Sequence, residues 1–192
     1  MRDGKPVDIV VSTQAAIAEL AAHNKVIAES VAILARSGIG VAVRAGGPKP
    51  DISSVEAFVA ALKRARSIAY ADPALRTPSG IYLAGLFERL VLTAELKSKA
   101  RLVGAVDGRP VVVCEAVASG DAELGIQQIA EIIPVEGVEL VGPLPAEIQH
   151  MTMFAAAILS PARNPTSARE FVAFLASETA QSVIAAHGME PA

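Results

Sequence analysis

Polar side chains cluster at two places where a predicted strand gives way to a predicted helix. The first junction runs from Asp72 to Tyr82 and carries the hydroxyl groups of Thr77 and Ser79. The second junction runs from Asp107 to Val111. The first turn of a helix leaves backbone N–H groups unpaired, and these groups together with the helix dipole attract anions. Each junction therefore predicts either a site for an anion or polar ligand or an ordinary helix cap, and the sequence leaves both interpretations open.

Basic residues in the two junctions could add positive charge to such a ligand site. Arg76 lies in the first junction and Arg109 in the second, where a guanidinium group could lie beside a bound anion. Pro110 is a residue type favoured at the first position of a helix, because its missing N–H would be unpaired there in any case. The second junction therefore predicts a helix that begins at Pro110 and runs to Ala118.

Side-chain combinations typical of catalysis are missing from the sequence. It contains no Gly-x-Ser-x-Gly, phosphate-loop or dinucleotide-binding pattern. The single cysteine, Cys114, lies among valines in a predicted helix, which is typical of a buried structural thiol. The three histidines, His23, His150 and His187, are far apart and lack the spacing of metal ligands. We therefore expect a protein that is not an enzyme, with no catalytic residue, no metal site and no cofactor.

The composition argues against several classes of protein. The chain has 192 residues, of which 52% are hydrophobic and 19% charged, so it can bury a core and does not have the composition of a disordered protein. One cysteine excludes a disulfide framework within the chain. A net charge of −3 without a cluster of Lys or Arg argues against nucleic acid as a partner. No apolar run is long enough to cross a bilayer, so we expect a protein that is not embedded in a membrane.

Predicted strands alternate with predicted helices along almost the whole sequence. Short apolar runs predict strands at 7–11, 39–43, 67–71, 101–103, 123–128, 138–142 and 151–159. Alanine-rich or amphipathic segments predict helices at 14–23, 55–65, 80–90 or 80–96, 110–118, 166–175 and 178–187. In the helix at 166–175, Phe171, Phe174 and Leu175 share the apolar face. This alternation is typical of an α/β fold with mostly parallel sheets.

The order and spacing of several motifs are similar to those of a known family. The segments that carry the likeness are Ala35–Gly46, Ala71–Pro73, Pro78–Tyr82, Ala122–Gln128, Ala168–Leu175, Ala180 and Gly188–Met189. Together they resemble, over nearly the whole chain, the substrate-binding proteins of ABC importers of the molybdate-binding type. The resemblance implies the type II periplasmic-binding-protein fold, in which two α/β lobes hold a ligand in the cleft between them by helix N-termini and hydroxyl groups.

The resemblance also implies which residues contact the ligand. Taken with the two junctions, it predicts the ligand-binding residues Ser12, Thr77, Ser79, Gly80, Arg109, Pro110 and Gln128. Gln128 departs from the molybdate binders, which carry a tyrosine at that position. An amide both donates and accepts hydrogen bonds, so it suits a small organic or carboxylate ligand at least as well. We therefore expect a small anion or polar metabolite as ligand and an ABC permease as a transport partner.

The sequence departs from the family in length as well, because the strand and helix pairs that usually come before the matching region are absent. The first lobe is then expected at 1–38 with 145–192, in incomplete form, and the second at 39–144. A second copy of the chain would cover the exposed sheet edge, which predicts a homodimer. The resemblance implies a periplasmic location, but the N-terminus lacks the apolar stretch of a signal peptide, so a cytoplasmic location follows if Met1 is the true start. The alternative function is a cytoplasmic ligand sensor or a repurposed dimeric relative without a transport role.

Overall fold

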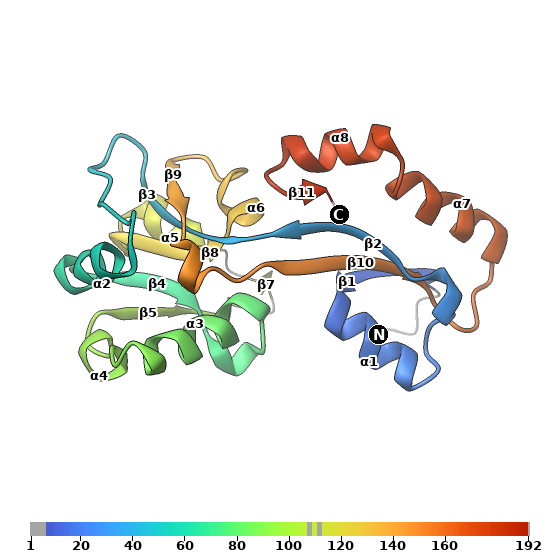
Figure 1. Ribbon diagram of the computed structural model, residues 1–192, viewed down its shortest axis with the longest axis horizontal. Coiled ribbons are helices and arrows are strands. Elements are labelled where there is room, and N and C mark those ends of the chain that lie inside the picture. The colour runs from blue at the N-terminus through green and yellow to red at the C-terminus, as the bar shows by residue number, and fades with distance from the viewer. Residues whose placement is uncertain (1–6, 107–108, 111–112, 192) are drawn as a thin grey trace. The chain divides into compact units, whose positions relative to one another are not determined.

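The computed structural model describes residues 7–106, 109–110 and 113–191, and these residues form two compact units (Figure 1). The chain passes from unit 1 to unit 2 after Ser37 and returns to unit 1 after Met151. The stretch 145–151 lies in unit 2, whereas the sequence placed it in the first lobe. It is anchored there because Gln149 pairs with the backbone of Ile39: its Oε1 accepts from the Ile39 N–H at 2.8 Å and its Nε2 donates to the Ile39 carbonyl at 2.9 Å.

Unit 1 is built on a four-stranded antiparallel sheet (Figure 1). In their order across the sheet, its strands are β1 (Ile9–Thr13), β10 (Thr152–Ile158), β2 (Ala32–Ser37) and β11 (Glu190–Pro191). Its helices are α1 (Gln14–Ala22), the 3-10 turn η1 (Ala28–Ser30), α7 (Pro165–Leu175) and α8 (Glu178–Ala186). The sequence predicted all of these elements except β2, η1 and β11.

Helices cover both faces of the central strand β10. Ala155 and Ala157 pack with Ile17 of α1, whereas Ala156 and Ile158 pack with Val172 of α7. After Thr152 at its start, the strand is apolar at every position and shows no alternation, because both of its faces are covered.

Helix α7 buries only part of the face that the sequence indicated. Ala168 and Val172 are its buried residues, and Leu175 packs against the same cluster, whereas Phe171 and Phe174 are 50% and 51% exposed. The two phenylalanines were wrongly expected there, because small side chains, spaced one turn apart, let the helix approach the alanine-rich sheet closely, and the larger rings are left outside.

Unit 2 contains a five-stranded mixed sheet with helices on both faces. In their order across the sheet, its strands are β5 (Ala100–Val103), β4 (Ile68–Ala71), β8 (Leu124–Gln128), β3 (Ile39–Arg44) and β9 (Val138–Pro143). The short strands β6 (Ala105–Val106) and β7 (Arg109–Pro110) pair separately. The helices and 3-10 turns are α2 (Val55–Arg64), η2 (Pro73–Leu75), α3 (Pro78–Arg89), α4 (Thr93–Leu96), α5 (Val113–Ser119), α6 (Ile129–Ile132) and η3 (Ala146–Ile148).

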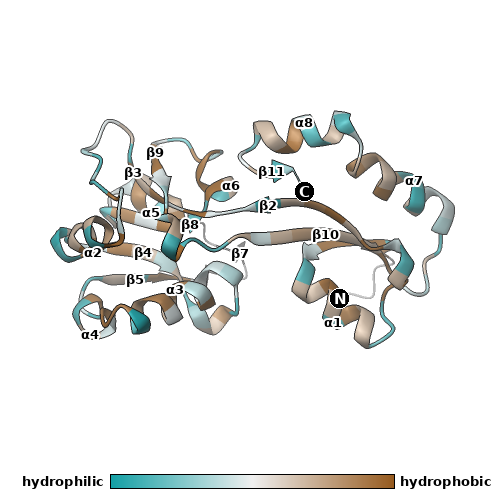
Figure 2. Ribbon diagram, in the orientation of Figure 1, coloured by the Kyte–Doolittle hydropathy of each residue, from teal (hydrophilic) through white to brown (hydrophobic). Residues whose placement is uncertain are grey.

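Strand β4 runs parallel to both β5 and β8, whereas β3 runs antiparallel to β8 and β9. The largest apolar cluster lies where α2 and α3 cover one face, and Phe58, Leu86 and Ile126 are among its fully buried members. A smaller cluster lies under α5 on the other face and includes Val117 and Ala69. In Figure 2 the strands of this sheet are largely coloured as hydrophobic. The α/β class is thus confirmed, and parallel pairing is concentrated at β4.

Two helix boundaries in unit 2 bear on the sequence prediction. The sequence left the end of the helix that was expected from 80 open between 90 and 96. The helix ends at Arg89, close to the shorter alternative, and α4 follows as a separate turn, because Val91 takes a left-handed conformation with φ of 55°. The helix expected to begin at Pro110 begins at Val113 instead. In the described ranges no helix is both long and apolar enough to cross a membrane.

Candidate functional site

The carboxyl ends of the parallel strands β4 and β8 meet at one edge of the unit 2 sheet. Their register, with Tyr70 opposite Ile126, brings the two ends level. The chain leaves β4 through η2 and enters α3, whereas β8 ends in Gln127 and Gln128. Ligands of open α/β sheets bind outside the carboxyl ends of the strands. This edge, with the start of α3 and the two glutamines, is the candidate site.

At the start of α3, Ser79 carries two hydrogen-bond donors that no described residue accepts. The Thr77 hydroxyl oxygen accepts from the Gly80 N–H at 3.3 Å, and the Thr77 carbonyl accepts from the Ile81 N–H at 3.0 Å. Pro78 has no N–H to offer. Ser79 is 4% exposed, and neither its N–H nor its hydroxyl bonds to another described residue. Thr77 is therefore the cap, and both donors of Ser79 are left for a ligand.

Gly80 fixes the start of α3 against the end of β4. A Cβ at this position would lie 2.7 Å from the carbonyl oxygen of Ala71 and 2.8 Å from the Thr77 hydroxyl oxygen. Real Cβ atoms essentially never come so close to another heavy atom, so only glycine fits without a shift. Gly80 thus contributes close packing, and its N–H is already used by the cap.

The two glutamines at the end of β8 lie on opposite faces of the sheet, because successive side chains of a strand alternate. Gln127 is 2% exposed, and its Oε1 accepts from the N–H of Val113, the first residue of α5, at 3.1 Å. Its Nε2 is buried and has no hydrogen-bond partner among the described residues. Gln128 is 4% exposed and lies opposite Ile39 of β3. The sequence pointed to Gln128 and not to Gln127, although two adjacent amides at a strand end were an available signal for both.

Two predicted ligand residues, Arg109 and Pro110, do not lie at the helix start that the sequence predicted for them. Arg109 and Pro110 form β7 and pair with Val106 and Ala105, so Pro110 does not open a helix. The dipeptide between β6 and β7 in the sequence, Asp-Gly, is typical of a two-residue hairpin connection, and this signal competes with proline as a helix start. The dipeptide itself lies outside the described residues, as do Val111 and Val112.

Ser12 belongs to unit 1 and is not part of the edge described above. It lies in β1 opposite Ala155 and is half-buried. The next residue, Thr13, provides the cap of α1, with its hydroxyl oxygen accepting from the Ala16 N–H at 3.2 Å. Ser12 is therefore not required as the cap and stays a predicted ligand residue.

The loop between β4 and α3 carries both signs of charge. The Asp72 carboxylate accepts from the Ala74 N–H at 2.9 Å and holds the turn η2 together. Burial, followed by the nearby charge of Asp72, raises the pKa of Tyr70, so this phenol stays neutral. Arg76 is exposed and left-handed, with φ of 57°. Among the residues that the structure describes, no group of three or more His, Cys, Asp or Glu could hold a metal ion.

Comparison with known proteins assigns the chain to a family. A sequence profile of bacterial extracellular solute-binding proteins matches residues 1–190. The chain belongs to this family. Among solved structures of similar fold is the periplasmic molybdate-binding protein of Azotobacter vinelandii, with a TM-score of 0.74 and 22% identity, over 97% of this chain and 79% of that one. The sulfate-binding protein of Mycobacterium tuberculosis has a TM-score of 0.71 and 22% identity, over 98% and 70%. At these identities the likeness shows the fold alone.

A relative found by sequence comparison corrects the expectation that the chain is not an enzyme. A protein from Pseudomonas sp that is named aconitate isomerase is 39% identical over 188 residues, which cover 97% of this chain and 68% of the relative. The expectation that the chain is not an enzyme is therefore wrong, since a relative of such similarity over almost the whole chain is an enzyme. The sequence carries none of the common catalytic motifs because those motifs belong to enzymes of other folds.

Proposed function

We propose that this protein binds a small polycarboxylate of the aconitate type at the carboxyl edge of the unit 2 sheet and isomerises it. The observation that carries the proposal is the 39% identity to an aconitate isomerase over 97% of the chain. The geometry supports it, because Ser79 offers an N–H and an O–H at the start of α3. Carboxylate oxygens accept strong, charge-assisted hydrogen bonds from such donors.

The donors at this edge suit a reaction in which negative charge moves within the substrate. Isomerisation leaves the atoms of the substrate unchanged, so the reaction needs no co-substrate. Fixed N–H and O–H groups stabilise charge where it develops, and they are most effective in a site that excludes water. Ser79 is held by the capped first turn of α3, and that turn is packed by Gly80 against β4. The proposed role of Ser79 is therefore to bind and orient one carboxylate group.

The test is an isomerisation assay with a matched pair of serine variants. The purified chain is incubated with cis-aconitate, and the trans isomer is followed by the proton NMR signal of its vinylic hydrogen. Ser79→Ala should lower the rate at least tenfold. Ser54→Ala should not, because Ser54 caps α2 of the same unit through a 3.2 Å bond to the Ala57 N–H and lies outside the site. Absence of conversion by the unaltered chain refutes the isomerase, and equal rates for the two variants refute the role of Ser79.

A second proposed function, solute capture for an ABC permease, is supported by the family to which the chain belongs. The assay is thermal unfolding with cis- and trans-aconitate, molybdate, sulfate and phosphate. A ligand at about a thousand times its Kd adds about 4 kcal/mol of stability, which is a shift of about 8 °C or more for a chain of this size. Stabilisation by aconitate without conversion would support capture over isomerisation. Stabilisation by molybdate alone would refute the polycarboxylate as ligand.

Homodimer formation is also a proposal, and the sheet of unit 1 supports it. Within the described chain β1 pairs with β10 alone, so one side of β1 is a sheet edge, and Val11 on that strand is 55% exposed. Open edges invite pairing with another chain. Static light scattering at micromolar concentration should give twice the mass of the chain, and a stable monomer would refute the proposal.

A further inference from the structure

A pocket of about 490 Å³ opens at the edge of the unit 2 sheet opposite the candidate site. The loop that enters β4 lines it, whereas the candidate site lies where β4 ends. Its other walls are the end of β3, strand β5, the end of α5 and the start of β8. Its polar lining consists chiefly of Arg44, Arg66, Arg101, Ser67 and Glu123, and we refer to it as the arginine pocket.

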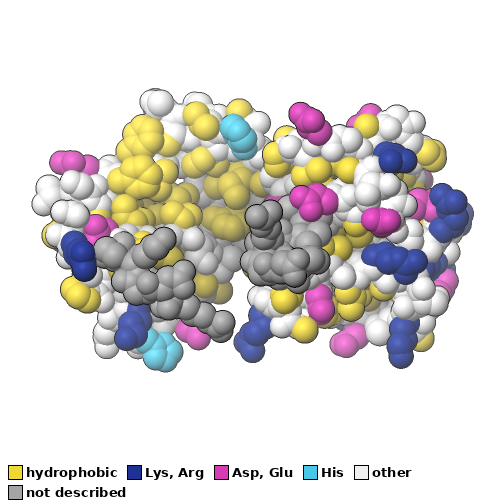
Figure 3. Space-filling view, turned by 180° about the vertical axis from the view of Figure 1, so that it is seen from behind, with side chains coloured by type: hydrophobic (Ala, Val, Ile, Leu, Met, Phe, Trp, Pro, Cys, Tyr) yellow, Lys and Arg dark blue, Asp and Glu magenta, His cyan; other side chains and the backbone are white. Residues whose placement is uncertain are grey.

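The charge of the arginine pocket is positive, although the whole chain has a net charge of −3. Three guanidinium groups face one carboxylate, which leaves an excess of two positive charges among the residues that line it. In Figure 3, Lys and Arg side chains (dark blue) are visible along the outer part of unit 2 at the right of the view. A pocket with an excess of one sign of charge concentrates ligands of the opposite sign.

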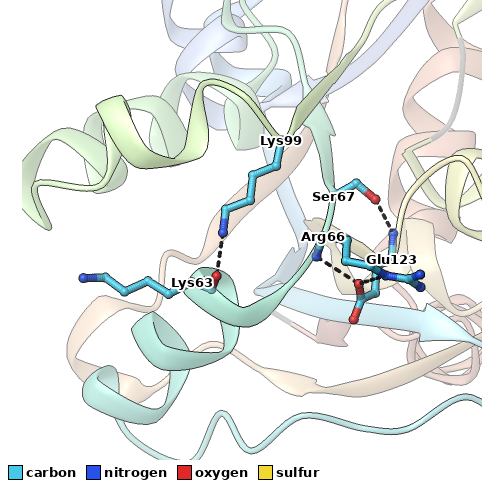
Figure 4. Close-up of polar contacts among 5 residues, drawn as sticks. All are labelled: Lys63, Arg66, Ser67, Lys99 and Glu123. Carbon is cyan, nitrogen blue, oxygen red and sulfur yellow. Dashed lines mark hydrogen bonds and ion pairs between the residues drawn. The ribbon is translucent and has the colours of Figure 1, made fainter.

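The Glu123 carboxylate pairs with Arg66 through one of its two oxygens (Figure 4). The Glu123 carboxylate accepts from the Arg66 backbone N–H at 2.9 Å and from the Arg66 Nε at 3.1 Å. The Glu123 backbone N–H donates to the Ser67 hydroxyl oxygen at 3.1 Å. Hydrogen bonds from Arg66 keep the pKa of Glu123 below its ordinary value, so the carboxyl group is ionised and paired at neutral pH. Glu123 therefore neutralises Arg66 and not the other two arginines.

Arg44 and Arg101 have no carboxylate partner among the described residues. Arg44 donates through Nη2 to the carbonyl of Ala118 at 2.8 Å, and Arg101 reaches the carbonyl of its neighbour Ala100 at 3.4 Å. The nearby acidic residue Asp121 accepts instead from the Ser119 hydroxyl at 2.8 Å. A guanidinium group has five N–H donors, so each of these two arginines keeps most of its donors for a ligand.

Two of the three arginines already have a hydrogen-bond partner that orients them. Gly120, with φ of 91°, lies beside the guanidinium of Arg44, whose Nη2 donates to the Ala118 carbonyl. Arg66 pairs with Glu123, although its side chain is 90% exposed. Groups that are already ordered lose less entropy on binding, so they contribute more to affinity.

We propose that the arginine pocket is a second ligand site, which binds a small anion with two or more carboxylate or phosphate groups. Two unpaired guanidinium groups match two such anionic groups, and guanidinium forms paired hydrogen bonds with either chemistry. The pocket volume of about 490 Å³ accommodates a molecule of metabolite size. The site is independent of the proposed isomerase activity, because none of its residues belongs to the edge that carries Ser79.

The test is calorimetric titration of the full chain with pyrophosphate and with tricarballylate, the saturated tricarboxylate, in moderate salt. The double variant Arg44→Gln, Arg101→Gln should weaken binding of at least one probe tenfold or more. Arg64→Gln is the matched control, because Arg64 is an exposed arginine of the same unit that does not line the pocket. It should change binding less than twofold. Circular dichroism of the variants checks that they fold, and the probe that binds identifies the preferred anion.

Three results would overturn the proposal, and they can be told apart from failure of the proposed function. Absence of binding by both probes overturns the second site but leaves the isomerase assay untouched. If the double variant and Arg64→Gln weaken probe binding equally, the probe is attracted by the overall positive charge of the surface and not by the arginine pocket. Loss of tricarballylate binding in Ser79→Ala, with full binding in the double variant, would place the ligand at the candidate site instead.

Discussion

The two glycines of α3 offer a test of how the candidate site is assembled, because alanine should have opposite effects at the two positions. At Gly80 an added Cβ would lie 2.7 Å from the Ala71 carbonyl and 2.8 Å from the Thr77 hydroxyl oxygen. At Gly85, in the same helix, the nearest atom would be the end of the Arg89 side chain at 3.8 Å, which is an ordinary contact. Gly80→Ala therefore collides with backbone, whereas Gly85→Ala fills open space.

The magnitudes follow from three contributions. Alanine is favoured over glycine in a helix by up to about 1 kcal/mol, so Gly85→Ala should stabilise the protein by up to that amount. At Gly80 the same gain is outweighed by overpacking, which costs about 1–3 kcal/mol. If Thr77 turns away from the new methyl group, loss of its cap costs about 1 kcal/mol more. Gly80→Ala should therefore destabilise the protein by about 1–3 kcal/mol.

The assay is urea unfolding followed by circular dichroism for the unaltered chain and both variants. Aconitate binding to each folded variant is measured in parallel. Gly80→Ala should also weaken binding, because relief of the collision moves the first turn of α3 and with it Ser79. Stabilisation by both substitutions would refute the close approach of α3 to β4. Destabilisation by both would refute the packing assigned to Gly85.

Three further predictions concern single side chains. Thr77→Ala should lower the free energy of unfolding by about 1 kcal/mol while Thr77→Ser restores it, and a thermal melt in which both variants match the unaltered chain would rule out the cap. Burial raises the pKa of the Cys114 thiol to about 12, so a thiol reagent at about pH 8 should react only after unfolding, and rapid reaction of the native chain would contradict its burial. The Asp8 carboxylate accepts from the Arg163 N–H, which lowers the pKa of Asp8 below 3.8; its contribution is present above that pH and should be lost as the pH falls further. Acid unfolding of Asp8→Asn should therefore lack this loss, and identical acid profiles of variant and unaltered chain would count against the pairing.

The sequence predicted the elements that have a strong local signal. The strands at β3, β4 and β8 were found because each is a short apolar run between turn residues. Strand β2 was missed, since Arg36 and Ser37 interrupt its apolar pattern and its identity depends on pairing with β10. Pairing between segments far apart in the sequence leaves little trace in either segment alone. The mixed direction of the strands was hidden for the same reason.

The sequence predicted the hydrogen-bond donors of the candidate site. It did not predict which of them caps the helix and which is left for a ligand. Hydroxyl groups at 77 and 79 marked the start of α3, but the sequence does not tell which of the two forms the cap. In the structure Thr77 has that role, because its Oγ1 accepts from the Gly80 N–H, and the hydroxyl of Ser79 is not needed for the cap. The helix start predicted at the second junction was wrong because two local sequence signals competed there. Proline at 110 favours a helix start, yet the pairing of β6 with β7 moved the start of α5 to Val113.

The buried amide of Gln127 combines one donor that is unpaired among the described residues with one hydrogen bond to a helix. A buried donor without a partner costs about 1–3 kcal/mol, so its retention in a folded protein calls for an offsetting gain. Part of the gain is structural, since Oε1 of the same amide pairs with the first N–H of α5 at 3.1 Å. That bond orients Nε2 as the remaining donor, and an apolar substitute at 127 would remove the unpaired donor but leave the Val113 N–H unpaired in its place. Gln127 therefore acts at this edge by tying the end of β8 to α5, since its Nε2 is buried away from any ligand outside.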